Sequence, residues 1–144
     1  SLLLPHYDTA RRMLGVAVNP RTWPADVLLK EIAGELGTAD TWQPTPVGTF
    51  FGQPDDEGQE VPDPYFGGEG PARAGCIHCG GCMVGCRYNA KNTLVKNYLW
   101  FAERAGVQII PETAVMDIRP LDGLAGETGY AVHMRKSTAW LRRQ

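Results

Sequence analysis

The chain has 144 residues, of which 43% are hydrophobic and 21% charged, and its formal net charge is -2. These values are typical of one ordinary globular domain and argue against an intrinsically disordered chain. A slightly acidic chain lacks the basic excess of a nucleic-acid surface, so we expect no nucleic-acid partner. No apolar run reaches the roughly 18 residues of a membrane helix, so we expect no membrane span and a cytoplasmic location.

The first part of the chain predicts two helices. Residues 5–14 begin with Pro5, which suits a first helical turn, and Gly15 follows them. The second helix is expected from an N-cap at Thr22 to Leu36, with Gly37 just beyond its end. Its apolar residues recur at helical spacing: Leu28, Leu29, Ile32, Ala33 and Leu36.

The middle of the chain predicts little regular structure. Residues 41–51 read as extended, but their two prolines confine them to an edge strand or an irregular segment. Residues 53–75 form a long polar connection rich in glycine and proline. A connection of that length is typical of a lid, a binding loop or a segment covered by a partner.

The last part predicts a third helix and short strands. The helix is expected from a cap at Asn92 or Thr93 to Gly106. Val107, Ile109 and Ile110 predict a short apolar strand at residues 107–110, which Pro111 interrupts. Residues 113–118 and 130–134 show the two-residue alternation of strands. The elements together predict an α+β fold.

All four cysteines lie between residues 76 and 86, in the spacing C-x₂-C-x₂-C-x₃-C. This spacing of Cys76, Cys79, Cys82 and Cys86 matches the bacterial ferredoxin run, so the four thiols are candidate ligands of an iron–sulfur cluster. Two differences weaken the match: Arg87 replaces the proline that follows in ferredoxins, and no second cysteine run exists.

Three other interpretations of the cysteines stay open. A structural zinc site normally pairs two C-x₂-C knuckles across a longer loop, so it fits this tight run poorly. Disulfides are disfavoured by a reducing cytoplasm. The thiols can also be simple packing groups in a glycine-rich turn, since free cysteine packs as a small apolar residue.

The segment after the cysteines resembles the glucose–methanol–choline (GMC) family of flavin oxidoreductases, particularly its cholesterol-oxidase-like branch. The resemblance covers most of residues 5–121 and is most specific after Gly75. It is carried by Asn89-Ala90-Lys91-Asn92-Thr93, Tyr98-Leu99, Ala102-Glu103, Gly106, Val115 to Ile118 and, near the start, Pro5, Tyr7, Ala10 and Leu14.

The resemblance implies an FAD enzyme that oxidises an alcohol, in particular a sterol-like one, by hydride transfer to flavin. Residues 1–88 would then belong to the substrate domain, with the cysteine-rich loop at residues 75–88. Residues 89–144 would be a helix–strand–strand portion that returns to the FAD-binding domain. The family places the backbone of one strand residue against the adenine of FAD, and the matching residue is Val115.

The resemblance also implies that the chain is an internal portion of a larger enzyme. No G-x-G-x-x-G loop is present, and the family's catalytic histidine has no counterpart among His6, His78 and His133, so we assign no catalytic residue and expect the fragment to be inactive alone. An iron–sulfur cluster here would relay electrons from flavin to an external acceptor. The alternative is a ferredoxin-like electron-transfer or metal-binding module without flavin.

Overall fold

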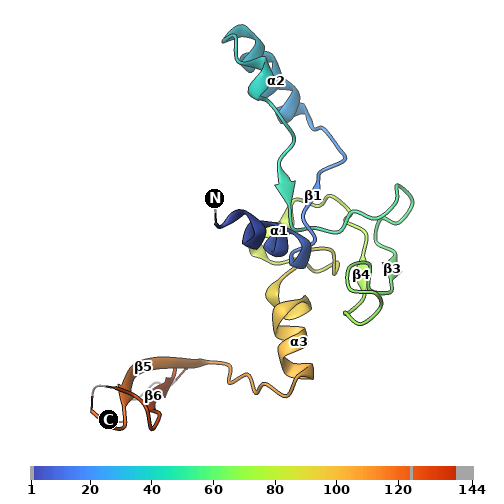
Figure 1. The fold of residues 1–144 in the computed structure, drawn as a ribbon. Helices are drawn as coiled ribbons and strands as arrows, with labels where there is room; N and C mark the ends of the chain where they lie inside the picture. Colours follow the sequence, from blue (N-terminus) through green and yellow to red (C-terminus); the bar gives the residue numbers. More distant parts are fainter. Residues whose placement is uncertain (1, 124, 139–144) are drawn as a thin grey trace. The chain divides into compact units, whose positions relative to one another are not determined.

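The computed structural model describes residues 2–123 and 125–138, and it divides into two compact units, Ser1–Gly106 and Val107–Gln144. Helices and small antiparallel sheets alternate along the chain (Figure 1), which confirms the α+β prediction. The elements are α1 (Leu4–Met13), β1 (Ala17–Val18), α2 (Pro24–Glu35), η1 (Ala39–Thr41), β2 (Pro46–Val47), β3 (Glu60–Val61), β4 (Arg73–Ala74), η2 (Gly81–Val84), η3 (Leu94–Lys96), α3 (Tyr98–Arg104), β5 (Thr113–Pro120) and β6 (Tyr130–Lys136).

The first two helices lie where the sequence predicts them, with one correction. The N-cap of α2 is Trp23 rather than Thr22, because the carboxylate of Asp26 accepts the backbone N–H of Trp23 at 2.8 Å. Gly37 follows α2 with φ +70°, which confirms it as the glycine that ends the helix. In the described part of the chain, no helix is long and apolar enough to cross a membrane.

The third predicted helix is broken in two by Asn97. The 3₁₀ turn η3 comes before Asn97 and α3 after it. Asn97 has non-helical backbone angles (φ -140°, ψ -97°), and its side-chain oxygen accepts the N–H of Tyr98 at 2.6 Å. Asn97, not Asn92 or Thr93, therefore caps α3. Gly106 follows α3 with φ +90°, as the sequence predicts for a left-handed stop.

The predicted strands are confirmed in part. Residues 41–51 contribute only the two-residue β2, which pairs antiparallel with β1. The prediction of a strand at residues 107–110 is wrong: these residues have no regular structure, and no described strand pairs with them. Pro111, which follows them, offers no backbone N–H to a neighbouring strand.

The second unit is a hairpin of β5 and β6. The register runs from Thr113 opposite Lys136 to Pro120 opposite Tyr130, with a shift between Val115 and Asp117. Met116 has no partner in this register, so a β-bulge interrupts the regular alternation that the sequence predicts.

The long connection at residues 53–75 is an ordered loop rather than an unstructured one. It contains the pair β3–β4, and the carboxylate of Asp63 accepts four backbone N–H groups in the turn at residues 65–70. The loop also packs on α3: Phe66 meets Phe101 edge to face, and the indole N–H of Trp100 donates to the carbonyl of Glu69 at 3.1 Å. These contacts hold the loop in one place.

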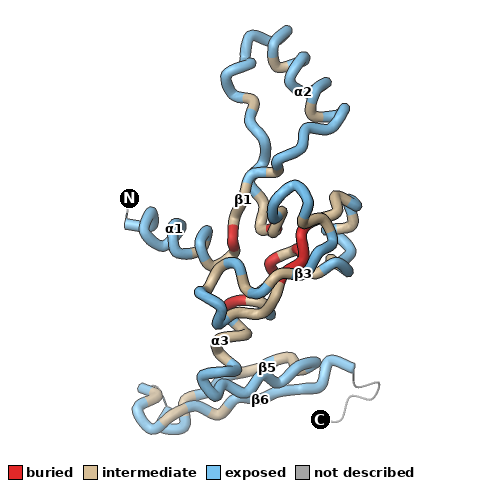
Figure 2. Tube along the Cα trace, turned by 90° about the vertical axis from the view of Figure 1, so that its right-hand side faces the viewer, coloured by how far each residue is buried: buried red, intermediate tan, exposed pale blue. Residues whose placement is uncertain are grey.

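The buried residues, red in Figure 2, lie in the first unit. Most of them belong to three segments that are distant in the chain, residues 48–50, 73–76 and 89–97. Residues 48–50 bond to both of the other segments: the N–H of Asn92 donates to the carbonyl of Gly48, and the N–H of Cys76 donates to the carbonyl of Phe50. The N–H of Phe50 donates to Ala90 at 2.9 Å. The described core is small and largely polar, and it lies directly under the cysteine loop.

Candidate functional site: a cavity bordered by four cysteines

The cysteine loop leaves the core directly after β4. Its start is anchored by the hydrogen bond of 3.0 Å between the Cys76 N–H and the Phe50 carbonyl. Gly80 and Gly85 flank η2 with φ +72° and +103°, angles that side chains strongly disfavour. The glycines of the loop therefore allow tight turns on both sides of η2, and all four cysteines border one cavity.

That cavity has a volume of about 570 Å³ and all four predicted cysteines border it. Its wall is formed by the ends of α1 and β2, the cysteine loop and the segment 88–92. The lining residues are Leu14, Val16, Asn19, Trp23, Val47, Gly48, Thr49, Phe51, Cys76, Ile77, His78, Cys79, Gly80, Gly81, Cys82, Cys86, Tyr88, Ala90, Lys91 and Asn92.

The four thiols have different surroundings. Cys79 and Cys82 are exposed, whereas Cys76 and Cys86 are half-buried. Burial, followed by repulsion from the other three cysteines, raises the pKa of Cys76, although one backbone N–H bond opposes the rise. Burial also pushes up the pKa of Cys86, but hydrogen bonds from backbone N–H groups in the segment 88–91 and the charge of Lys96 outweigh it, so the net pKa is lowered.

The structure does not show the cysteines gathered as metal ligands. Within residues 2–123 and 125–138, no group of three or more His, Cys, Asp or Glu side chains converges as metal ligands. A cluster needs several thiolates directed at one point, and here the four sulfurs only border a common cavity. The structure thus gives no support to the iron–sulfur ligand set Cys76, Cys79, Cys82 and Cys86, which stays a prediction.

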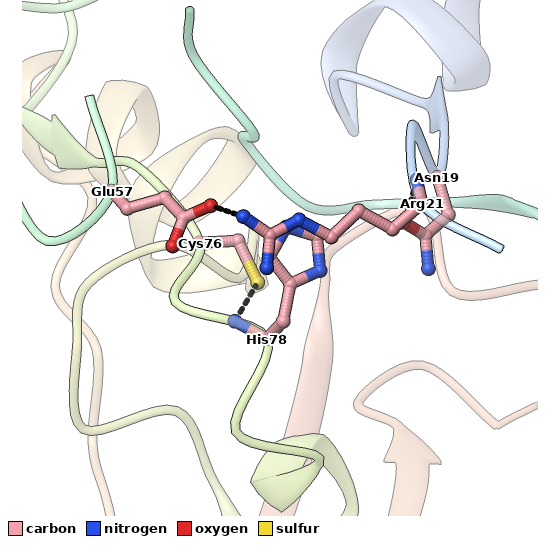
Figure 3. Close-up of polar contacts among 5 residues, drawn as sticks. All are labelled: Asn19, Arg21, Glu57, Cys76 and His78. Carbon is pink, nitrogen blue, oxygen red and sulfur yellow. Dashed lines mark hydrogen bonds and ion pairs between the residues drawn. The ribbon is translucent and has the colours of Figure 1, made fainter. Parts of the chain in front are cut away.

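His78 lines the cavity together with the aromatic side chains of Phe51 and Trp23. Figure 3 shows His78 beside Cys76. Its ring stacks on Phe51 with centroids 5.6 Å apart and meets Trp23 at 6.0 Å. Its backbone N–H donates to the sulfur of Cys76 at 3.4 Å, and its φ of +56° is unusual for a non-glycine residue. The ring of His78 is thus packed between two aromatic side chains of the cavity wall.

An ion pair lies beside this wall. The guanidinium of Arg21 donates to the carboxylate of Glu57, and the backbone N–H of Arg21 donates to the side chain of Asn19 at 3.0 Å (Figure 3). Arg21 precedes α2 and Glu57 belongs to the loop at residues 53–75, so the pair joins the two segments next to the cavity. Both side chains are partly exposed, and such pairs contribute little stability.

Arg73 is the residue that sequence reasoning missed. Its side chain is fully buried, and in the described residues no carboxylate pairs with it. Its guanidinium donates to Asn92 Oδ1 at 2.6 Å, to the Lys96 carbonyl at 2.8 Å and to the Pro71 carbonyl at 2.5 Å. Burial lowers the pKa of Arg73. An isolated arginine in a glycine-rich loop carries no sequence signal for this burial.

Val115, the predicted adenine contact, belongs to the second unit. It lies on β5 opposite Met134, directly before the bulge, and is 55% exposed. The cysteines belong to the first unit. No observation in the structure tests a contact between Val115 and FAD, so this role of Val115 stays a prediction.

Comparisons with known proteins give one relationship. No family model matches the chain, and no solved structure matches it. Proteins named "Cholesterol oxidase" from two strains of Mycobacterium tuberculosis are each 57% identical over 145 residues, 98% of this chain and 24% of the relative. A protein of the same name from Acinetobacter baumannii is 50% identical over 141 residues, 96% of this chain and 25% of the relative. The chain spans about a quarter of the length of these relatives, and over nearly its own whole length it is related to that segment of proteins named cholesterol oxidase.

Proposed function

We propose that this chain is part of an FAD-dependent oxidoreductase of the GMC type that oxidises the alcohol group of a sterol. The observation that carries the proposal is the identity of 50% to 57% over nearly the whole chain to proteins named cholesterol oxidase. The residues from Asn89 to Ile118 support it, because they resemble the GMC pattern after the cysteine loop. The small-molecule partner is then a sterol alcohol.

FAD, when bound in the parent enzyme, accepts a hydride from the carbon that bears the hydroxyl group. Toward the cofactor, this chain would contribute backbone contacts and no reacting group. The bulge after Val115 leaves Met116 without a partner in the β5–β6 register. Backbone groups that no ladder uses can contact the edge of a purine ring. An unpaired residue directly after Val115 is therefore compatible with the predicted contact between the Val115 backbone and adenine.

Other parts of the prediction belong to the same proposal. Residues 1–88 are assigned to the substrate domain and residues 89–144 to the portion that returns to the FAD-binding domain. The enzyme is expected to be cytoplasmic and to pass its electrons to an acceptor. An iron–sulfur relay has no support in the structure, because no group of three or more metal-ligand side chains converges in the described residues. For the same reason the structure gives no support to the ferredoxin-like alternative.

The experiment is a spectrum of the full-length parent before and after anaerobic addition of a sterol. We expect flavin absorption bands, and bleaching of those bands by a 3β-hydroxysterol as hydride is transferred. The matched control is the same sterol skeleton without its hydroxyl group, which offers no carbinol hydride. A parent without flavin, or with flavin that the hydroxysterol leaves oxidised, contradicts the proposal.

A further inference from the structure

The tip of the cysteine loop contains the sequence Cys79-Gly80-Gly81-Cys82. Its two cysteines are the exposed ones of the four, and both border the cavity. Two thiols separated by two residues have the spacing of C-x-x-C motifs, which cycle between dithiol and disulfide. Cys76 and Cys79 have the same spacing, but Cys76 is half-buried, so Cys79 and Cys82 are the C-x-x-C pair with both thiols open to solvent.

The backbone of the tip places the sulfur of Cys79 close to the residue that precedes Cys82. Gly80 adopts φ +72° and caps η2, which contains Cys82 in its first turn. A Cβ atom built on Gly81 would lie 3.6 Å from the sulfur of Cys79, so this sulfur lies over the residue next to Cys82. A Cβ built on Gly80 meets nothing within 4 Å, so no other described part of the chain crowds the turn in which an S–S bond of about 2.05 Å would form.

The tip is also open to small molecules. Met83 and Val84, which follow Cys82, are 94% and 92% exposed. A small disulfide can therefore approach the two thiols from solvent. In a reducing compartment, a disulfide at such an exposed position is transient and responds to the redox state.

We infer that Cys79 and Cys82 form a redox-active dithiol that a low-molecular-weight disulfide of the glutathione class oxidises. One deprotonated thiol attacks a sulfur of the small disulfide, a mixed disulfide forms and one small thiol leaves. The second cysteine then attacks the mixed disulfide, the Cys79–Cys82 bond forms and the second small thiol leaves. The two cysteines lose two electrons and two protons in total, and the small disulfide gains them. The inference does not depend on the proposed sterol oxidation.

The test uses the full-length parent, equilibrated without oxygen in a series of reduced and oxidised glutathione mixtures. Remaining thiols are alkylated, and the tryptic peptide at residues 74–87, which holds all four cysteines, is weighed and fragmented. We expect a product that carries only two alkyl groups, on Cys76 and Cys86, and that lacks the two thiol hydrogens of Cys79 and Cys82, with the bond located between these two cysteines. Cys79→Ser should lower the yield of the intramolecular disulfide by about tenfold or more and leave a mixed disulfide with glutathione on Cys82.

Cys86→Ser is the matched control, since it removes a half-buried cysteine of the same loop and should leave the Cys79–Cys82 yield within about twofold. Mapping in the unaltered parent decides the question even if a variant folds poorly. Three results would each overturn the inference. One is a bond that joins Cys76 to Cys86, and another is the absence of an intramolecular disulfide throughout the series. The third is iron and acid-labile sulfide in the purified parent that Cys79→Ser lowers, since the thiols would then be cluster ligands.

Discussion

Replacing Arg73 by methionine tests whether the buried guanidinium holds residues 73–76 and 89–97 together. Methionine has a similar length and no hydrogen-bond donors, so Arg73→Met leaves Asn92 Oδ1 and the carbonyls of Lys96 and Pro71 without this donor. A buried acceptor without a partner costs about 1–3 kcal/mol, and the two part-buried carbonyls keep some access to water, so the three together cost about 2–6 kcal/mol. Removing a buried charge that has no carboxylate partner regains part of that cost. We therefore expect a net loss of about 2–4 kcal/mol.

The measurement is amide hydrogen exchange in the full-length parent, because local opening free energies can be assigned to segments there. Protection should fall most at residues 73–76 and 89–97, which Arg73 connects. Arg21→Met is the matched control: the partly exposed pair with Glu57 should be worth about 0–1 kcal/mol. If both variants lose the same small amount, below about 1 kcal/mol, the hydrogen bonds of Arg73 do not hold these segments together.

Three further predictions concern single features of the chain. Gly106→Val should destabilise the parent by about 1 kcal/mol or more, because φ is +90° at Gly106. The control is Gly34→Ala in the interior of α2, where the surroundings are equally open, and it should stabilise the parent by about 0.5–1 kcal/mol. Thermal unfolding compares the two variants, and equal effects refute the backbone argument. Burial opposes ionisation of Asp63, but four backbone N–H bonds outweigh it and lower its pKa, so its contribution to stability is present above the unfolded-state pKa and is lost as pH falls through the folded-state pKa. Exchange protection of residues 65–70 should therefore decrease on acidification below about pH 4, and Asp63→Asn should abolish that dependence; an unchanged acid response in the variant contradicts it. Residues 1–144 alone should bind FAD weakly or not at all, since no glycine-rich phosphate loop is present, and micromolar binding by calorimetry would refute this.

The sequence by itself determined the features that depend on neighbouring residues. The helices α1 and α2 follow from apolar spacing and from proline at their starts. The stops at Gly37 and Gly106 follow from glycine's tolerance of positive φ. The α+β class and the existence of strands β5 and β6 also follow from local periodicity, because helix and strand periods are properties of short stretches.

Only the tertiary structure decided which of these stretches stay regular and what the cysteines can do. The fully buried Asn97 breaks the third helix, and residues 107–110 stay irregular because no described strand pairs with them, so burial and pairing outweigh local propensity. The spacing of the cysteines allowed a cluster, packing or a disulfide. The fold made Cys79 and Cys82 exposed and half-buried the other two. Such differences in exposure, like the burial of Arg73, arise from contacts among residues 48–50, 73–76 and 89–97, which are distant in the chain.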